Sequence, residues 1–185
     1  MADVFGVGKL QATIGRYGGF AKGNRYNVNF NNFPTGLSGG AAFAGDLSYL
    51  CEAVTLPTKS IAGTPHDIYG PPREISYRET FTEAALSFIL DDVFTVKRFF
   101  DDWQTKIISP TTNNPSYYND YVGTINITRL SNDASDFETA QNKYKIQLIE
   151  AYPSVVGDVA LGHSLGAEIL RLNVTFKYRR WNFLP

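Results

Sequence analysis

The clearest hydrophobic pattern lies in the last part of the sequence. Between residues 170 and 178 an apolar side chain occupies every second position, and the positions between are polar. A period of two over nine residues is typical of a strand with one buried face and one exposed face. The same alternation, or a short run rich in β-branched and aromatic residues, predicts further strands at 25–30, 47–55, 74–79, 83–90, 121–130, 143–152 and 159–163.

One segment has the period of a helix instead. Its apolar side chains step by three and four through Val93, Val96, Phe100, Trp103 and Ile107, so they form a single stripe. Two aspartates directly precede this stripe, where they suit the positive start of a helix. About eight strands and one helix predict a mainly β fold, an antiparallel β-sandwich or barrel with one packed α-helix. The expected structural core includes Val96, Phe100 and Trp103 from the helix and Val174 and Phe176 from the last strand.

Glycine and proline divide the chain into an arm and a domain. Residues 1–24 are rich in glycine and are predicted to form a flexible N-terminal arm, and residues 25–185 are predicted to form a single β domain. Two further stretches, 31–45 and 58–72, contain several glycines and prolines and are interpreted as loops. A loop as long as 58–72 within a compact domain usually has a function.

Composition removes several classes of function. The net charge of −1 argues against a protein that reads nucleic-acid sequence, because such binding needs concentrated lysine and arginine. The single cysteine, Cys51, excludes an internal disulfide framework and a four-cysteine metal site, and we interpret it as a small buried side chain. No apolar run is long enough for a membrane helix, and the first 20 residues lack a secretion-signal pattern. We therefore expect no membrane anchor, folding in a reducing cytoplasm and no cofactor.

One motif suggests an enzyme. The segment Gly162-His163-Ser164-Leu165-Gly166 matches, by its letters, the nucleophile elbow of lipases. That elbow needs a helix after the serine and a histidine later in the chain. Here a β pattern follows Ser164, and both histidines of the sequence, His66 and His163, come before it. We interpret the segment as a turn between strands, and a serine hydrolase that uses Ser164 stays open as an alternative for an ester-cleavage assay.

Two charged groups have simpler interpretations than a binding site. The aspartates at 91, 92, 101 and 102 could suggest a metal cluster, but adjacent carboxylates on a helix point in different directions, so no metal site is expected. The pair Arg179-Arg180 before Trp181 is either part of a subunit interface or only a soluble chain end.

Taken in order, five segments of the chain resemble the tail-tube proteins of contractile-tailed bacteriophages. They are residues 24–28 (NRYNV), 50–57 (LCEAVTLP), 96–104 (VKRFFDDWQ), 151–157 (AYPSVVG) and 173–181 (NVTFKYRRW). No single segment is specific, but their fixed order with matching gaps is. The glycine-rich arm and the insertion at 31–45 depart from the family pattern, so no family role is assigned to them.

The resemblance implies a structural subunit and not an enzyme. Such proteins form homohexameric rings that stack into a hollow tube inside a contractile sheath, and DNA passes down the bore during ejection. If each subunit lends about four strands to a shared inner wall, six subunits give a closed barrel of roughly two dozen strands, wider than barrels that already hold a water-filled channel. The implied partners are further copies of the chain and the sheath, baseplate and tail-terminator proteins. The implied location is the tail of the virion, assembled in the bacterial host cytoplasm.

The resemblance also points to contact residues. In the family the long loop reaches along the tube axis and packs against the neighbouring ring. The candidates for contacts between rings or subunits are His66, Asp67, Ile68, Tyr69, Pro71, Arg73, Arg179, Arg180 and Trp181. Two alternatives share the fold: a baseplate protein that initiates the tube, and the inner-tube protein of a related contractile injection or secretion device. The sequence leaves open which strand faces line the bore.

Overall fold

The computed structural model describes residues 6–67, 70–132, 142–163, 166 and 168–184. In chain order its elements are α1 (Val7–Arg16), β1 (Tyr26–Asn31), α2 (Gly40–Leu50), β2 (Cys51–Val54), β3 (Lys59–His66), β4 (Arg73–Phe81), β5 (Ala84–Ile89), α3 (Thr95–Ile107), α4 (Tyr118–Tyr121), β6 (Gly123–Leu130), β7 (Asn142–Val156), β8 (Arg171–Lys177) and β9 (Arg180–Leu184). All strand pairs among these elements are antiparallel, so the expected class, mainly β with a packed helix, is confirmed.

Strand β7 belongs to two four-stranded layers. Its first part pairs with β6 and β9, and β6 pairs with β1; we call this layer sheet A. Its last part pairs with β8, which continues to β5 and β2; we call this layer sheet B. The strand turns from one layer to the other at Glu150, which has a φ of 56°. The amide of Arg179 donates to the carbonyl of Ile149 at 3.1 Å beside this bend, between the ends of β8 and β9.

The core lies between the two layers. In sheet A, Val28 pairs with Ile127 and Phe30 pairs with Ile125, and all four side chains are buried. In sheet B, the alternating apolar residues of β5 and β8 are also buried; Leu86 and Val174, for example, form one such pair. The period of two in the sequence therefore arises because each strand turns one face toward the opposite sheet.

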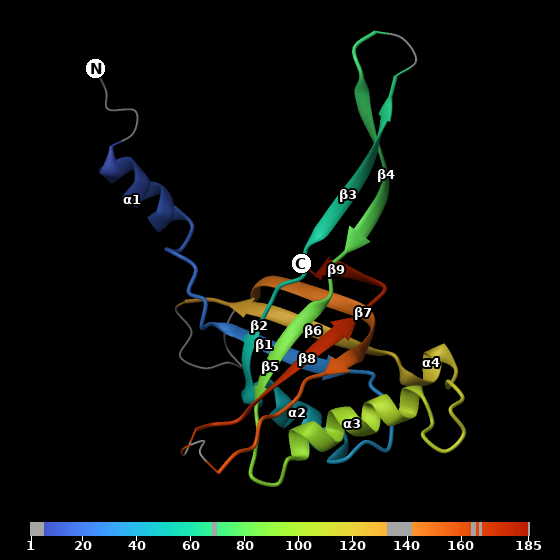
Figure 1. Ribbon diagram of the computed structural model, residues 1–185. Coiled ribbons are helices and arrows are strands. Elements are labelled where there is room, and N and C mark those ends of the chain that lie inside the picture. The colour runs from blue at the N-terminus through green and yellow to red at the C-terminus, as the bar shows by residue number, and fades with distance from the viewer. Residues whose placement is uncertain (1–5, 68–69, 133–141, 164–165, 167, 185) are drawn as a thin grey trace.

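Helix α3 closes one end of this core, beneath the sheets in Figure 1. Asp91 accepts hydrogen bonds from the Thr95 hydroxyl at 2.6 Å and from the Val96 amide at 3.3 Å, which fixes the first turn. These hydrogen bonds outweigh the opposing effect of partial burial, so the pKa of Asp91 is lowered. The five residues expected in the core, Val96, Phe100, Trp103, Val174 and Phe176, all have no exposed surface. Val93, the first member of the predicted stripe, lies before the helix and is exposed.

The predicted strand at 47–55 is wrong over most of its length. Helix α2 occupies 40–50, so it also replaces part of the predicted loop at 31–45, and only Cys51–Val54 form a strand. The residues that α2 turns toward the core are Phe43, Ala44, Leu47 and Leu50, which is helical spacing. The alternation of Leu47 with Tyr49 was misleading, because Tyr49 is exposed.

Three further expectations need correction. The predicted loop at 58–72 contains strand β3, which pairs along its whole length with β4. The predicted strand at 159–163 has no strand structure: the amide of Gly157 donates to the carbonyl of Asn173 at 2.7 Å, and the chain then leaves the sheet. The predicted final strand is divided into β8 and β9, because residues 178 and 179 lie opposite the bend of β7.

The N-terminal arm contains a helix that the sequence analysis did not expect. Helix α1 extends away from the two sheets in Figure 1, and none of its residues is buried. The helix ends at Arg16 because Gly18 and Gly19 take left-handed backbone angles, and the amide of Gly19 donates back to the carbonyl of Ile14 at 2.9 Å.

Candidate assembly interface

The β3–β4 hairpin projects far from the body of the protein (Figure 1). Strand β3 continues the direction of the chain from β2, and β4 leads into β5, so the hairpin is an extension of sheet B. Its base is fixed by hydrogen bonds between Thr58 and Thr82: the Thr82 amide donates to the Thr58 carbonyl at 3.1 Å, and the Thr58 amide donates to Oγ1 of Thr82 at 2.9 Å. Beyond this base the two strands pair with each other alone.

The hairpin carries exposed apolar side chains on both of its faces. Ile61 is 62% exposed, Ile75 is 52% exposed and Tyr77 is 68% exposed. Ile61 pairs with Glu79 and Ile75 pairs with Thr64, and a bulge lies between these two pairs, so Ile61 and Ile75 lie on opposite faces. The only ion pair across these strands in the described residues joins Lys59 to Glu79 at 2.7 Å. A two-stranded hairpin on its own is marginally stable at best in water.

The predicted contact residues of the long loop lie at the far end of the hairpin. His66 pairs with Arg73 across the last rung of β3 and β4, and both side chains are exposed. Asp67 and Pro71 are also exposed beside the turn. Ile68 and Tyr69 lie outside the described residues. The described loop candidates are therefore gathered at the end of the hairpin that lies away from the sheets in Figure 1.

The C-terminal candidates lie elsewhere, in and beside sheet A. Arg179 pairs with Glu150 at 2.9 Å across the bend of β7. This bond, with a hydrogen bond from Tyr118, outweighs partial desolvation and lowers the pKa of Glu150. Arg180 is exposed in β9, whereas Trp181 is partly buried against the core cluster. The structure thus places the candidate contact residues in two separate clusters, one at the hairpin tip and one at the bend of β7. In the second cluster Arg179 forms an ion pair within the subunit.

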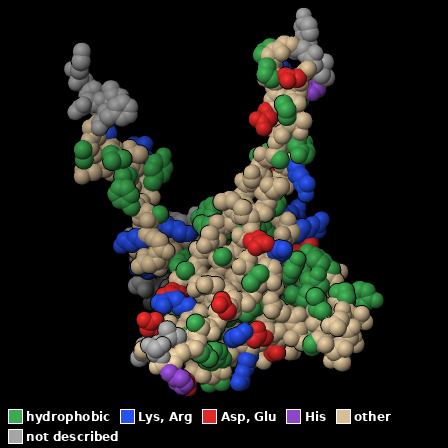
Figure 2. Space-filling model, in the orientation of Figure 1, with side chains coloured by type: hydrophobic (Ala, Val, Ile, Leu, Met, Phe, Trp, Pro, Cys, Tyr) green, Lys and Arg blue, Asp and Glu red, His purple; other side chains and the backbone are tan. Residues whose placement is uncertain are grey.

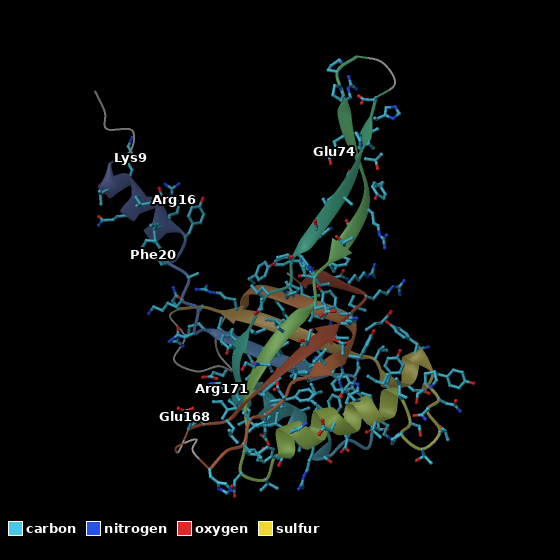
Figure 3. All side chains as sticks on the ribbon, in the orientation of Figure 1. Lys9, Arg16, Phe20, Glu74, Glu168 and Arg171 are labelled. Carbon is cyan, nitrogen blue, oxygen red and sulfur yellow. The ribbon has the colours of Figure 1, made fainter. Side chains whose placement is uncertain are left out.

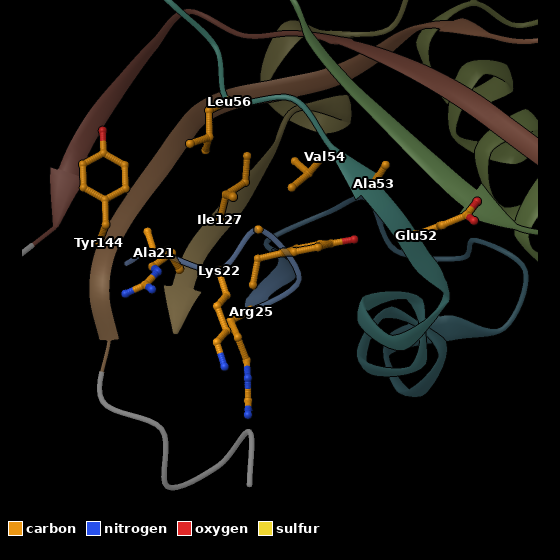
Figure 4. Close-up of a pocket in the computed structure, with 12 residues that line it drawn as sticks. Ala21, Lys22, Arg25, Glu52, Ala53, Val54, Leu56, Ile127 and Tyr144 are labelled. Carbon is orange, nitrogen blue, oxygen red and sulfur yellow. The ribbon is translucent and has the colours of Figure 1, made fainter. Parts of the chain in front are cut away.

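Both layers have strand edges that pair with nothing in the described residues. In sheet B these are β2 and the last part of β7, and in sheet A they are β1 and β9. The edges of β1 and β2 approach each other without pairing, and the Tyr26 hydroxyl donates to the Cys51 carbonyl at 3.0 Å between them. A hollow of about 370 Å³ opens beside this gap (Figure 4). Its lining includes Leu56, Ile127 and Tyr144. The subunit is therefore an open sandwich and not a closed barrel.

The outer face of sheet B has its charges in pairs. Arg171 of β8 donates from two nitrogens to the carboxylate of Glu52 on β2, one of these bonds being 2.9 Å. The same hydrogen bonds lower the pKa of Glu52. Lys177 lies 3.5 Å from Glu83 at the other end of β8. Between the pairs this face carries Asn173, half-buried Thr175, small residues of β5 and, beside Thr175, exposed Val155 of β7, so its charges balance and it is only partly polar.

A group of tyrosines covers the side of the body near α4, where Figure 2 shows hydrophobic side chains gathered at the right. The rings of Tyr118 and Tyr152 both stack edge-on against Tyr121 at 5.5 Å. Burial, with smaller contributions from Glu150, raises the pKa of Tyr118 to about 12. A hollow of about 370 Å³ separates these rings from Tyr178 at the hairpin base. Tyrosine is enriched at protein interfaces, so this side is a candidate contact surface.

The residues that suggested chemistry do not form a site in the described structure. Ser164 lies outside the described residues, so the expectation that it does no catalysis stays a prediction. His66 belongs to the hairpin and His163 to the segment after β7, at opposite ends of the fold in Figure 1. Within the described ranges no three His, Cys, Asp or Glu side chains gather as a metal ion would need. None of the described helices is long and apolar enough to span a membrane.

The family model of the phage tail tube protein matches residues 21–184. The chain belongs to the phage tail tube protein family. A comparison with curated protein sequences returns no match.

Solved structures share the fold of this tail tube family member. A chain in the anti-feeding prophage baseplate has a TM-score of 0.59 at 12% identity, covering 89% of this chain and 95% of that one. A chain in the tube-terminating cap of the anti-feeding prophage has a TM-score of 0.60 at 11% identity, with coverages of 89% and 91%. A chain in the extended sheath-tube complex of an extracellular contractile injection system has a TM-score of 0.56 at 10% identity, with coverages of 97% and 98%. Such low identities establish a common fold.

Sequence reasoning missed two apolar surfaces. Ile75 and Tyr77 alternate with polar residues, which is the pattern of a strand with one buried face. The pattern does not indicate that these two side chains are exposed in the subunit. In the arm, Val7, Leu10 and Ile14 already have helical spacing, and the glycines at 8 and 15 obscured it.

Proposed function

We propose that this protein is the subunit of homohexameric rings that stack into the inner tube of a contractile phage tail. Membership of the tail tube family supports the tube, and the observation that carries the stacked rings is the β3–β4 hairpin. It extends sheet B beyond the body, ends in exposed charged residues, and pairs with no other strand of the described residues. A neighbouring ring supplies the surface that such an element needs.

Sheet B forms the inner wall in this arrangement. The hairpin continues the strands of sheet B, so the strands that reach the next ring are also the strands of the wall. The free edges at β2 and β7 close against neighbouring subunits, which removes the exposed edges that otherwise invite aggregation. Six copies of four strands give a barrel of about two dozen strands, wide enough for an open bore. The paired charges of Glu52 with Arg171 and Glu83 with Lys177 keep that wall from attracting DNA that passes through it.

The remaining partners follow from the same role. A sheath surrounds the tube, a baseplate protein begins it and a terminator ends it, and the protein resides in the virion after assembly in the host cytoplasm. A baseplate initiator would have the same fold, since a chain of a solved baseplate shares it. The two roles differ in one property: a tube subunit adds ring upon ring, and an initiator stops after the first.

Electron microscopy of the purified protein tests the proposal. The wild type is expected to form hexameric rings and long tubes. In the test variant, residues 60–80 are replaced by Asn-Gly, a turn that joins the paired residues Lys59 and Phe81 and keeps the Thr58–Thr82 base. This variant is expected to melt like the wild type, because all of the removed described residues are exposed or half-buried and lie outside the core cluster, and to stop at single rings.

A matched control retains the hairpin. Ser60→Ala with Thr80→Ala changes a pair of exposed polar residues near the base of the hairpin and should leave tube length unchanged. Tubes of normal length from the hairpin-less variant would overturn the stacking role. A wild type that forms neither rings nor tubes under any assembly condition would overturn the function, and rings that never grow would identify an initiator.

A further inference from the structure

Helix α1 is amphipathic, and its apolar stripe faces solvent. Val7, Leu10, Ile14 and Tyr17 follow one another by three and four residues and therefore share one face of the helix. Val7 is 71% exposed, Leu10 58% and Tyr17 79%. A free helix of this length is marginal in water, and packing of an apolar stripe is what usually stabilises one. The tail tube family match begins at residue 21 and leaves this helix out.

The base of the arm lies beside the free edge of β2. Residues 21–23 of the arm and residues 52–54 of the strand line the same hollow (Figure 4). The side-chain amide of Asn132 donates to the carbonyl of Phe20 at 2.7 Å and to that of Gly18 at 3.4 Å, which fixes the chain just after the helix. From this point α1 extends away from the body at the left of Figures 1 and 3.

An exposed aromatic surface lies on the opposite side of the body, beside the last part of β7. We call it the tyrosine surface, and it consists of Tyr117, Tyr118, Tyr121 and Tyr152. Tyr152 belongs to β7 and stacks against Tyr121, while Tyr117 is 85% exposed and Tyr118 is 43% exposed. The hollow of about 370 Å³ between these rings and Tyr178 gives the surface a depression into which apolar side chains can pack.

The proposed ring brings the arm and the tyrosine surface together. The free edges of sheet B are β2 and the last part of β7, so a ring of head-to-tail contacts joins β2 of one copy to β7 of the next. The arm starts beside β2 and the tyrosine surface lies beside β7, so the arm of the first copy is placed next to the tyrosine surface of the second. A helix of ten residues is about 15 Å long, about three strand spacings, so α1 is long enough to cross the joint.

Charge favours the same pairing. Residues 6–25 contain four lysine and arginine residues and no carboxylate. The two cations that line the hollow, Lys177 and Arg179, are each paired with a glutamate. Residues 107–128, which include α4, contain one carboxylate, Asp120, and no lysine or arginine. The tyrosine surface is therefore weakly acidic and attracts the basic arm.

We propose that α1 of one subunit docks, through the stripe formed by Val7, Leu10, Ile14 and Tyr17, on the tyrosine surface of the neighbouring copy in the ring. This inference rests on the proposed ring and names a second contact within it. The helix forms a strap across each joint between two copies of sheet B, and the hollow beside Tyr178 receives side chains of the stripe. Because α1 points away from the tyrosine surface of its own chain in Figure 1, the partner is a second copy.

Cross-linking between two differently tagged chains tests the contact. One chain carries Leu10→Cys and the other Tyr117→Cys, and the mixed chains are assembled and treated with a short bismaleimide. The native Cys51 is buried and gives no background, which the wild type treated alone verifies. The expected result is a covalent pair that contains both tags. In the matched control, Ala12→Cys replaces Leu10→Cys and places the thiol on the opposite face of the helix, so the yield should fall about fivefold or more.

The hairpin-less variant shows whether the contact lies within a ring. It is expected to stop at single rings, and it keeps Phe81 and Thr82, which line the hollow. Leu10→Cys and Tyr117→Cys should therefore cross-link in its single rings as they do in tubes of the full-length chain. A cross-link that forms only in stacked rings would overturn docking on the neighbour in the same ring.

A second measurement does not depend on cysteine reactivity. Leu10→Ser with Ile14→Ser should leave the melting temperature of the free subunit unchanged, because α1 has no buried residue. The same change should raise the protein concentration needed for assembly about tenfold or more, because it removes apolar area from the contact. Ala12→Ser, on the opposite face of the helix, is the control and should leave that concentration unchanged. An equal rise for both variants would contradict a contact made by the stripe.

The outcomes separate this inference from the proposed function. Rings or tubes that form normally while Leu10→Cys and Tyr117→Cys fail to cross-link would overturn the docking of α1 and leave the tube role intact. A cross-link that forms only within one chain carrying both substitutions would replace the second copy by the chain's own tyrosine surface. Failure of the wild type to assemble at all would overturn the tube role, and with it the ring on which this contact rests.

Discussion

Trp103 provides the sharpest test of how the helix is held against the sheets. Its side chain has no exposed surface, and its rings contact Phe99, Phe176 and Phe33 at centroid distances of 6.0, 6.3 and 6.5 Å. The indole N–H donates to the carbonyl of Tyr121 at 2.7 Å. Trp103→Ala therefore removes a large buried volume and leaves a carbonyl without its donor.

The expected loss of stability has two contributions, the lost packing of the ring and the lost hydrogen bond. Large-to-alanine changes of buried aromatic residues lower the free energy of unfolding by about 3–5 kcal/mol. The unpaired carbonyl of Tyr121 places Trp103→Ala toward the upper end of that range. For a domain of this size, 5 kcal/mol corresponds to a fall in melting temperature of about 10–20 °C. Total stability is only about 5–15 kcal/mol, so much of the variant should be insoluble.

Two companion variants separate the contributions. Trp103→Phe keeps most of the ring packing and loses the hydrogen bond, and it should cost about 1–3 kcal/mol. Val93→Ala changes the exposed first residue of the predicted stripe and should stay within about 0.5 kcal/mol of the wild type. Urea unfolding followed by tryptophan-independent circular dichroism gives all three values. A loss below about 1 kcal/mol for Trp103→Ala would refute the packing of α3 against the core.

Two further predictions concern ionisable groups. The partners of Glu150 lower its pKa in the folded state, so its charged form stabilises the fold. This contribution is present above the unfolded pKa of about 4.3 and is lost as the pH falls through the folded pKa. Glu150→Gln should therefore lower the melting temperature at pH ~7, and the difference from the wild type should vanish near pH ~2. An equal difference at both pH values would show that the charge at the bend does not matter. Burial raises the pKa of Cys51 to about 12, so its thiol should react with a maleimide at pH ~8 only after denaturation, and fast labelling of the folded protein would contradict its buried position at the start of β2.

The sequence predicted those elements whose apolar residues face the subunit's own core. Strands β6 and β8 and helix α3 each have one buried face, so their periods of 2 and 3.6 are visible in the letters. Segment 40–50 was misread because its glycines resemble a loop and because the apolar residues at 47, 49, 51 and 53 alternate across the junction of α2 and β2. The segment at 159–163 alternates, but Leu161 is exposed and no neighbouring strand is available to it.

The candidate interface was harder to predict for a physical reason. Strand β3 has exposed side chains at most positions, and its glycine and proline resemble a loop, so no hydrophobic period marks it. Its pairing with β4 follows from chain connection and not from burial. Contacts between subunits leave no trace in the subunit's own core. The tip candidates His66 and Arg73 came from the family resemblance, whereas the shaft residues Ile61 and Tyr77 became visible only through their exposure in the structure.

The separation of core and contact surfaces has a consequence for how a tube can grow. The core cluster contains no residue of α1, β3 or β4, so the body can fold before either projection has a partner. Each projection is marginal alone, so in the proposed tube the entropy lost on fixing it would reduce the affinity of any single contact. One contact would then be weak and reversible. A subunit held at two neighbours and at the next ring would bind tightly, because its linked sites raise one another's effective concentration. Wrong additions would therefore dissociate, and a correctly closed ring would persist. A subunit with rigid, tightly binding projections would lose this correction and would trap misplaced copies.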